Sequence, residues 1–299
     1  MNRRTLVLGM GSLLLGGRIA LAKESDRRII DTQTGKDASW KNMLDSAAKS
    51  HAVFLGEQHD DTETHRVELS ILKDLYKRVG KRLILSMEMF ERDQQILLDQ
   101  HLAGVITATE LGQKTKLWNN YATDYAPLVQ FSAAEHIPVL AANCPNAIIR
   151  KIGQGGLAAL ASLPESERKY AADSIIAPEG DTYSQKFMAT MSGMGGAHGA
   201  AMEPATLRRI YEAQCTRDDT MAESIVRSMS ASSVVLHING GFHSEGGLGT
   251  AARVQWRRPI ATRTTIIHII PTNDPLSSAR VEPGSTPGNY VIFVKNTKT

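Results

Sequence analysis

Acidic and imidazole side chains follow a short apolar segment in the first third of the chain. Residues 52–55 are apolar and lead into Gly56, and Glu57 and His59 come directly afterwards. Carboxylates and imidazoles act as general acids and bases in enzymes, and the same groups bind divalent metal ions. If residues 52–55 form a buried strand, its carboxyl end is where α/β folds place their chemistry. Glu57 and His59 are therefore candidate site residues.

Two further groups of the same kind follow later apolar segments. Glu88 and Glu91 come after residues 83–87, and His243 comes after residues 234–238. The carboxyl ends of parallel strands meet at one edge of a sheet, so we expect these side chains to gather there. The set that we expect to form a catalytic site is Glu57, His59, Glu88 and His243.

Three interpretations of this set remain open. With a divalent ion, two imidazoles and several carboxylates activate water, as in a metal-dependent hydrolase. Without a metal, the same groups supply a general base and a general acid. The structural alternative is that they cap neighbouring helices or pair with an arginine such as Arg92.

A second feature is the segment 187–202, which is poor in charge and rich in methionine, glycine and alanine. Its glycines predict that no helix continues through it. An apolar, adaptable segment suits a large flat ligand such as haem, with His198 or Tyr183 as axial ligand to the iron. Thioethers also suit Cu(I), whose ligands here would be Met188, Met191, Met194 and His198. The third interpretation is a pliable loop packed on the domain.

Apolar, β-branched segments recur along the chain, and helical patterns separate most of them. The predicted strands cover residues 52–55, 83–87, 137–142, 234–238, 264–270 and 290–294. The predicted helices cover residues 62–79, with Thr62 as the cap, 94–102, 126–134 and 204–229. Continuous apolar strands alternating with helices indicate an α/β fold with a mostly parallel sheet flanked by helices. The alternation stops at about residues 145–232, which we expect to form a helical insert within a single domain of residues 23–299.

The first 22 residues have the pattern of a secretory signal peptide. Arg3 and Arg4 precede an apolar run, and a small-x-small cleavage site ends at Ala22. No cysteine follows the run, so we expect a periplasmic protein that is not a lipoprotein, exported by the twin-arginine or the general secretory route. Three of the 34 Lys and Arg residues lie in this segment, which leaves 31 against 31 Asp and Glu. This balance gives no argument for nucleic-acid binding.

The chain has two cysteines, Cys144 and Cys215. In an oxidising compartment they could form a disulfide, and the alternative is two buried thiols. Sequence gives no distance between them, so both remain open.

Taken in order, these motifs resemble the ChaN-like haem-binding uptake family of the Tiki/TraB/erythromycin-esterase superfamily. The resemblance covers about residues 45–270. The segments that carry it are Gly56-Glu57-Gln58-His59-Asp60, Glu88-Met89-Phe90-Glu91-Arg92, residues 137–145, His198-Gly199 and Gly240-Gly241-Phe242-His243.

The resemblance implies haem binding linked to iron acquisition, through a homodimer that shelters the porphyrin. The haem would lie on the insert, with His198 and Tyr183 as candidate iron ligands and Met191 and Met194 as part of the apolar wall. Its partners would be an outer-membrane haem receptor or an inner-membrane haem transporter. Family members are often lipoproteins, and this chain departs from them in lacking the lipidation cysteine. The superfamily also includes hydrolases and metalloproteases, which keeps the metal-dependent hydrolase and a divalent metal cofactor as the alternative to haem.

Overall fold

A computed structural model describes residues 27–195, 202–258, 262–276, 280–281 and 287–297. The predicted signal peptide and His198 lie outside the described residues. In the part of the chain that the structure describes, no helix combines the length and apolarity needed to span a membrane.

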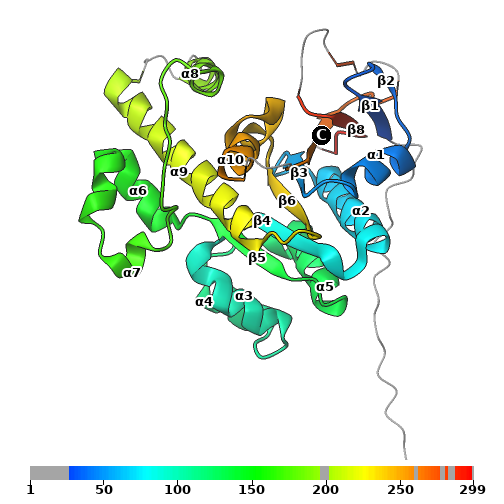
Figure 1. The fold of residues 1–299 in the computed structure, drawn as a ribbon, viewed down its shortest axis with the longest axis horizontal. Coiled ribbons are helices and arrows are strands. Elements are labelled where there is room, and N and C mark those ends of the chain that lie inside the picture. Colours follow the sequence, from blue (N-terminus) through cyan, green and yellow to red (C-terminus); the bar gives the residue numbers. More distant parts are fainter. Residues whose placement is uncertain (1–26, 196–201, 259–261, 277–279, 282–286, 298–299) are drawn as a thin grey trace, which may run out of the picture.

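An eight-stranded sheet forms the centre of the molecule, in the order β2-β1-β8-β7-β3-β6-β4-β5 (Figure 1). The strands are β1 (Arg27–Asp31), β2 (Lys36–Asp37), β3 (Ala52–Glu57), β4 (Leu83–Glu91), β5 (Val139–Asn143), β6 (Val234–Gly240), β7 (Thr264–Thr272) and β8 (Tyr290–Lys295). The strands from β8 to β5 are parallel to their neighbours, whereas β1 pairs antiparallel with both β8 and β2. The predicted α/β fold with a mostly parallel sheet is confirmed.

Ten α-helices surround the described part of the sheet. They are α1 (Trp40–Ala47), α2 (Thr62–Val79), α3 (Gln95–Leu102), α4 (Ala108–Lys114), α5 (Ala126–Ala134), α6 (Asn146–Gly155), α7 (Glu165–Arg168), α8 (Thr182–Gly195), α9 (Pro204–Ser228) and α10 (Gly249–Arg257). A π-helical turn, Tyr121–Tyr125, precedes α5.

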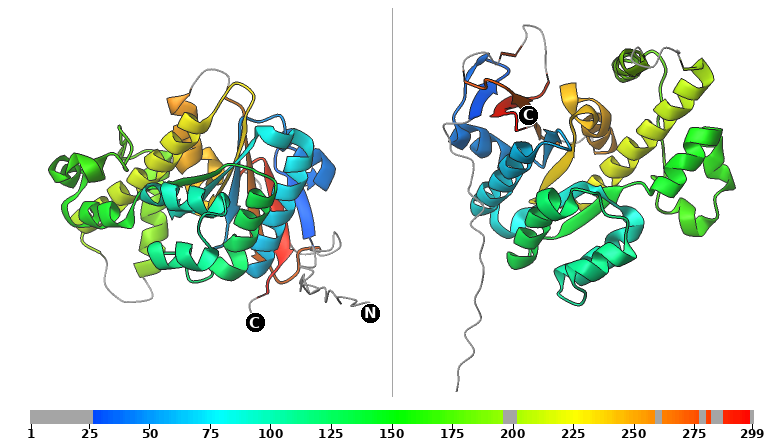
Figure 2. Two further views of the ribbon diagram at one scale, coloured as in Figure 1. Left: turned by 90° about the horizontal axis from the view of Figure 1, so that it is seen from below. Right: turned by 180° about the vertical axis from the view of Figure 1, so that it is seen from behind.

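Alternate residues of β3 face two different layers of helices. Val53 and Leu55 belong to the large core formed with α1, α2 and α5, and Ala52 and Phe54 belong to the smaller core formed with α9 and α10. Figure 2 shows these two groups of helices on opposite sides of the sheet. Every residue of β3 is therefore buried, which explains its continuous apolar sequence.

The helix α2 begins where the first site motif ends. Asp61, rather than the predicted Thr62, is its cap, because the Asp61 carboxylate accepts a hydrogen bond from the Thr64 backbone N–H. Gly80 ends the helix with a positive φ of 58°. This cap fixes the direction in which the chain leaves the strand end, and so the place of His59.

The helices α6 to α8 lie beside the end of α9 that is farther from the sheet (Figure 1). The helix α8 continues through Gly193 to Gly195, where the glycines predicted a break. Two buried aromatic side chains of α8, Tyr183 and Phe187, pack against Tyr211 of α9. Aromatic packing therefore holds the first two turns of α8 against α9.

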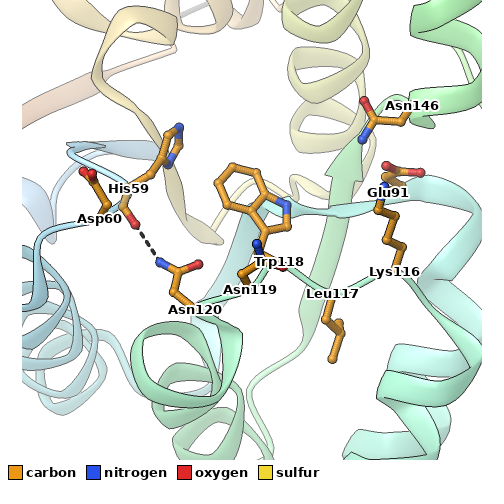
Figure 3. Close-up of a pocket in the computed structure, with 9 residues that line it drawn as sticks. All are labelled: His59, Asp60, Glu91, Lys116, Leu117, Trp118, Asn119, Asn120 and Asn146. Atoms are coloured by element: carbon orange, nitrogen blue, oxygen red, sulfur yellow. Dashed lines mark hydrogen bonds between the residues drawn. The ribbon is translucent and has the colours of Figure 1, made fainter.

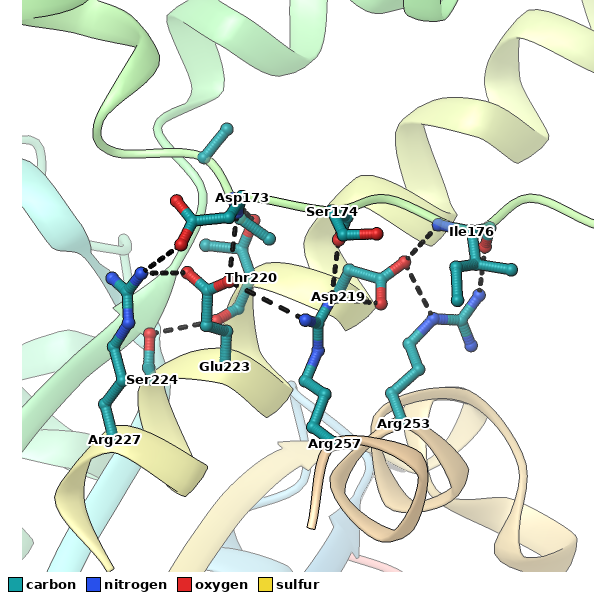
Figure 4. A network of polar contacts seen from close by, with 12 residues as sticks. Asp173, Ser174, Ile176, Asp219, Thr220, Glu223, Ser224, Arg227, Arg253 and Arg257 are labelled. Carbon is teal, nitrogen blue, oxygen red and sulfur yellow. Dashed lines mark hydrogen bonds and ion pairs between the residues drawn. The ribbon is translucent and has the colours of Figure 1, made fainter. Parts of the chain in front are cut away.

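A network of ion pairs holds the segment between α7 and α8 against α9 and α10 (Figure 4). Asp219 is buried and pairs with Arg253 and Arg257, and it accepts a hydrogen bond from the Ile176 N–H at 2.8 Å. Glu223 accepts one from the Asp173 N–H at 3.0 Å. These contacts tie the backbone that leads into α8 to the helices that cover the sheet.

One edge of the sheet is completed by a side chain. Gln95 of α3 accepts a hydrogen bond from the Ala141 N–H at 2.7 Å and donates one to the Val139 carbonyl at 2.9 Å. The amide therefore takes the place of a further strand beside β5.

The two cysteines are both free and buried. Cys144 belongs to the cluster around α6, and Cys215 packs with the aromatic residues of α8 and α9. Burial raises the pKa of each thiol to about 12. Of the two alternatives, the structure has the two buried thiols.

Candidate functional site

The strand-end residues gather at the carboxyl edge of β3, β4 and β6. Glu57 is the last residue of β3 and is paired in register with Gly240, the last residue of β6. Glu88 of β4 reaches across to the same point, where its Oε2 accepts a hydrogen bond from the Gly240 N–H at 2.8 Å. The sheet thus brings the predicted catalytic set together, and it arranges the set as two adjoining pairs.

The first pair is Glu57 and His59. Glu57 Oε1 accepts hydrogen bonds from Tyr125 Oη at 2.7 Å and from His59 Nδ1 at 2.5 Å. Burial opposes ionisation of Glu57, but its hydrogen bonds to His59 and His65 lower its pKa to about 2. His59 keeps 40% of its side chain exposed, so this imidazole is the part of the pair that a ligand can reach.

The second pair is Glu88 and His243, extended by Asp218 of α9. His243 Nδ1 lies 2.7 Å from Asp218 Oδ1, and His243 Nε2 lies 3.4 Å from Glu88 Oε1. Burial opposes the charged imidazole, but the two carboxylates raise the pKa of His243 to about 10. The positive charge of His243 in turn lowers the pKa of Glu88 against the effect of burial. The pair is therefore a buried imidazolium between two carboxylates.

The glycines of both histidine motifs make room for imidazole rings. A Cβ on Gly240 would lie 2.6 Å from His59 Nε2, and a Cβ on Gly56 would lie 2.7 Å from His268 Cε1. Neither distance is one that a real Cβ can adopt, so a larger residue would displace the ring. The Gly240–His243 motif therefore makes room for the imidazole of the Gly56–His59 motif, and Gly56 makes room for His268 of β7.

A third group lies on the core side of Glu57, on the helix α2. His65 Nδ1 is 2.9 Å from Glu68 Oε2 and 3.4 Å from Glu57 Oε2. Burial opposes the charged imidazole of His65, but hydrogen bonds to these carboxylates raise its pKa to about 11. Burial and the nearby charge of Glu57 raise the pKa of Glu68. Sequence analysis did not assign a role to this pair, although spacing of three residues places both side chains on one face of a helix.

Tyr183, a predicted haem ligand, is buried beneath α8. Its hydroxyl donates a hydrogen bond to Asp218 Oδ2 at 2.6 Å. Burial and the charge of Asp218 raise the pKa of Tyr183. Asp218 therefore connects the insert to the strand-end site, because it contacts both Tyr183 and His243.

The predicted apolar wall lies partly within the described residues. Met188 and Met191 pack against the aromatic cluster of α8 and α9. The side chain of Met194 lies outside the described part, as does His198. The proposals for haem and Cu(I) at His198 stay predictions.

A cleft of about 670 Å3 joins α8 to the carboxyl edge of the sheet. Its floor includes Glu57, His59 and His243, and burial lowers the pKa of a further floor residue, His268, to about 4. Its wall contains the apolar residues Phe187, Met191, Phe242, Ile269 and Ile270. Lys186 also lines the cleft. The cleft brings together the two sequence features, the strand-end motifs and the methionine-rich helix.

A second pocket, of about 460 Å3, adjoins the cleft at His59. Figure 3 shows Trp118 between His59 on one side and Glu91 and Asn146 on the other. The Trp118 ring meets the His59 ring edge-on, with 4.8 Å between centroids. Glu91 also lines a pocket of about 280 Å3 with Glu88 and His243, and burial raises its pKa. The 280 Å3 pocket is thus the polar side of the site, and it shares His243 with the cleft.

Comparison with solved structures shows the same fold in ChaN of Campylobacter jejuni, whose structure was described for cofacial haem binding. The two chains are 19% identical, with a TM-score of 0.66 over 91% of this chain and 98% of that chain. Two more distant matches are the type III effector HopBA1, at 10% identity, 85% and 91% coverage and a TM-score of 0.44, and a mutant of the erythromycin esterase EreC, at 11% identity, 90% and 83% coverage and a TM-score of 0.46. No curated protein sequence matches the chain.

The family comparison covers most of the chain. Residues 43–254 match the family described as haem-binding uptake, Tiki superfamily, ChaN. This range contains the strand-end motifs from β3, β4 and β6, and it contains the helices α8 and α9. The predicted resemblance is confirmed, and the chain belongs to the ChaN haem-binding uptake family of the Tiki superfamily.

Proposed function

We propose that this protein binds haem in the 670 Å3 cleft between α8 and the sheet edge, and acts in haem or iron uptake as a carrier or holder. The observation that carries the proposal is that apolar and aromatic side chains, with histidines beside them, line this cleft. The chain belongs to a haem-binding family, which agrees with that lining. Its volume is within the range of about 300–1,000 Å3 that is usual for small-molecule sites.

The chemistry of the cleft fits a porphyrin. Phe187, Met191 and Phe242 provide an apolar wall for the macrocycle. Lys186 provides a cation for a propionate, and it now pairs with Glu245 at 2.6 Å while lying 4.8 Å from the centre of the Phe242 ring. Glu245 keeps 44% of its side chain exposed, so a propionate can replace it as the partner of Lys186 without leaving a buried, unpaired charge.

We propose His198 as the axial ligand in preference to Tyr183. A tyrosine binds ferric iron as phenolate, and the contact with Asp218 disfavours that form by raising the pKa of Tyr183. His198 follows Met191 closely in sequence, and Met191 lines the cleft.

Titration of the purified chain with hemin tests the proposal. We expect a Soret shift that saturates, an affinity at least tenfold lower in His198→Ala, and an affinity changed by less than threefold in Tyr183→Phe. A larger loss of hemin affinity in Tyr183→Phe than in His198→Ala would instead identify Tyr183 as the ligand. Absence of a saturable shift in the wild-type chain would refute haem binding.

We further propose that the protein works in the periplasm, after export directed by residues 1–22, and that it exchanges haem with an outer-membrane receptor or an inner-membrane transporter. The motivation is the basic and apolar pattern of that segment. Fractionation of cells that express the full chain should recover a species shortened by about 22 residues in the periplasm. Recovery of the uncleaved chain in the cytoplasm would contradict this proposal.

A metal-dependent hydrolase is the second candidate function, and one observation favours it. The 280 Å3 pocket presents Glu88, Glu91 and His243 to a small polar ligand, with Arg217 and Asn146 in its wall. The pKa of Glu88 is lowered and the pKa of Glu91 is raised. Two neighbouring carboxyl groups with pKa values shifted in opposite directions suit a general base, here Glu88, and a general acid, here Glu91. Hydrolysis of ester or amide substrates that is abolished in Glu88→Gln would support this function, and activity that is unchanged in Glu88→Gln would remove it.

A further inference from the structure

Three ionisable side chains form a cluster on the core side of the site, and one of them, Glu57, also lines the cleft. Among the described residues, Glu57, His65 and Glu68 are the one group of His, Cys, Asp or Glu side chains whose ligand atoms all lie within 4.8 Å of one another. The side chains of Glu57 and Glu68 have no exposed surface, and that of His65 keeps 3%. Groups of this kind are buried only with partners that compensate their charge.

The outward-facing atoms of the cluster have such partners. His65 Nε2 donates a hydrogen bond to the His59 carbonyl at 3.2 Å, which turns Nδ1 toward the two carboxylates. Glu57 Oε1 accepts from Tyr125 Oη at 2.7 Å. Histidine ligands of metal ions usually donate their other ring N–H to a carbonyl or carboxylate, and carboxylate ligands are usually hydrogen-bonded in turn.

The inward-facing atoms lack partners. Glu57 Oε2 and Glu68 Oε1 are buried without a hydrogen-bond partner of good geometry within the described residues, and His65 Nδ1 lies 3.4 Å from Glu57 Oε2. A buried polar atom left without a partner costs about 1–3 kcal/mol, so two such atoms on the carboxylates of one cluster indicate a group that joins them.

We propose that Glu57 Oε2, His65 Nδ1 and a Glu68 carboxylate oxygen bind one divalent transition-metal ion. Ligands of a tetrahedral zinc ion lie roughly 3.3 Å apart, and His65 Nδ1 is 3.4 Å from Glu57 Oε2 and 2.9 Å from Glu68 Oε2. One imidazole with two carboxylates suits Zn2+ or Mn2+. The ion would neutralise the two carboxylates in the core.

The role of this ion is structural. It connects β3, through Glu57, to α2, through His65 and Glu68, at the point where the chain turns toward His59. His65 and Glu68 do not line the cleft, and the cluster shares Glu57 alone with the cleft floor.

The test is metal binding by the chain purified without chelators, then stripped and titrated with Zn2+ and with Mn2+. We expect about one ion per chain for one of these metals, and a higher melting temperature with the ion than in EDTA. Glu68→Gln keeps the shape of the side chain and should weaken the affinity at least tenfold. Glu63→Gln is the matched control on the same helix, since Glu63 pairs with Arg66 outside the cluster, and should bind as the wild type does.

Two results would overturn the proposal. One is a wild-type chain that binds neither ion stoichiometrically and has the same melting temperature with added ion and in EDTA. A water molecule, and not an ion, would then join the carboxylate oxygens of the cluster. The other is an ion retained in Glu68→Gln but lost in His243→Gln, which would place the ion at the strand-end pair. Hemin binding is measured separately on the same proteins, so failure of the haem proposal leaves this test intact.

Discussion

At the scale of single residues, the site is built from opposite charges that are buried together. Glu57 pairs with two imidazoles, and His243 pairs with two carboxylates, Glu88 and Asp218. Removing one member of such a group leaves its partner charged and unpaired in the core, which is more costly than the pair itself is favourable. Substitutions here therefore change folding as well as ligand binding, and both must be measured.

Replacing Gly240 with alanine should displace the His59 ring. The new Cβ would lie 2.6 Å from His59 Nε2, and relieving such a contact costs about 1–3 kcal/mol of unfolding free energy. Urea denaturation measures the loss. The control is Gly153→Ala in α6, where a Cβ meets nothing within 4 Å, and it should be neutral or stabilise by up to about 1 kcal/mol. Equal effects of the two substitutions would contradict the role assigned to Gly240.

The ion pairs of His243 predict a pH dependence of stability. Its pKa is raised from 6.5 to about 10, so its stabilising contribution is complete below pH 6.5 and is lost as the pH rises toward 10. The difference in unfolding free energy between wild type and His243→Gln should shrink over that window, by up to about 1.4 kcal/mol per pH unit. A difference for His243→Gln that grows with pH would contradict the assignment.

At this scale, sequence reasoning identified the residues but not their partners. Glu57, His59, Glu88 and His243 were predictable because each follows an apolar strand. Asp218 and Glu68 were not, since each lies inside a helix whose register against the sheet depends on packing far away in sequence. The division of the set into two pairs is likewise a matter of distances that a sequence does not contain.

At the scale of elements, the position of α8 decides the width of the cleft. The segment that leads into α8 is held by the ion-pair network of Asp219 and Glu223 described above (Figure 4). Loosening that network would move Phe187 and Met191 away from the sheet edge, because both belong to α8.

Asp219→Asn should therefore destabilise the protein and weaken hemin binding together. Arg253 is left buried without its carboxylate, at a cost of about 3–5 kcal/mol. The matched control is Asp173→Asn, because Asp173 forms an exposed pair with Arg227 and should contribute less than about 1 kcal/mol. Thermal unfolding and hemin titration measure the two effects. A wild-type melting temperature in Asp219→Asn would show that the network does not hold α8.

The elements themselves were largely predictable where packing and periodicity agree. The parallel strands have continuous apolar sequences, and α5 has the bounds that its pattern predicts. The strands β1 and β2 were missed because β1 depends on pairing with β8, at the other end of the chain. The extension of α8 to Gly195 was missed because glycine has a low helix propensity, whereas the helix continues from turns that pack on α9.

At the scale of the whole molecule, the proposed function predicts assembly. A haem held at the mouth of a cleft keeps one face exposed, and a second chain would cover it. Sedimentation of the purified chain at low micromolar concentration should show a monomer without hemin and a dimer with it, and His198→Ala should need more hemin for the same change. A hemin-bound chain that sediments as a monomer at every concentration would exclude the dimer.

The Gln95 side chain limits how two copies can meet. An exposed edge strand can form backbone hydrogen bonds with a strand of a neighbouring chain, and such pairing is a common route to aggregation. The amide of Gln95 occupies that ladder beside β5, and the other outer strand, β2, is two charged residues long. Two copies therefore cannot extend the sheet at the β5 edge, where Gln95 occupies the backbone groups, and the β2 edge is too short for it. Association would then use the helical surfaces.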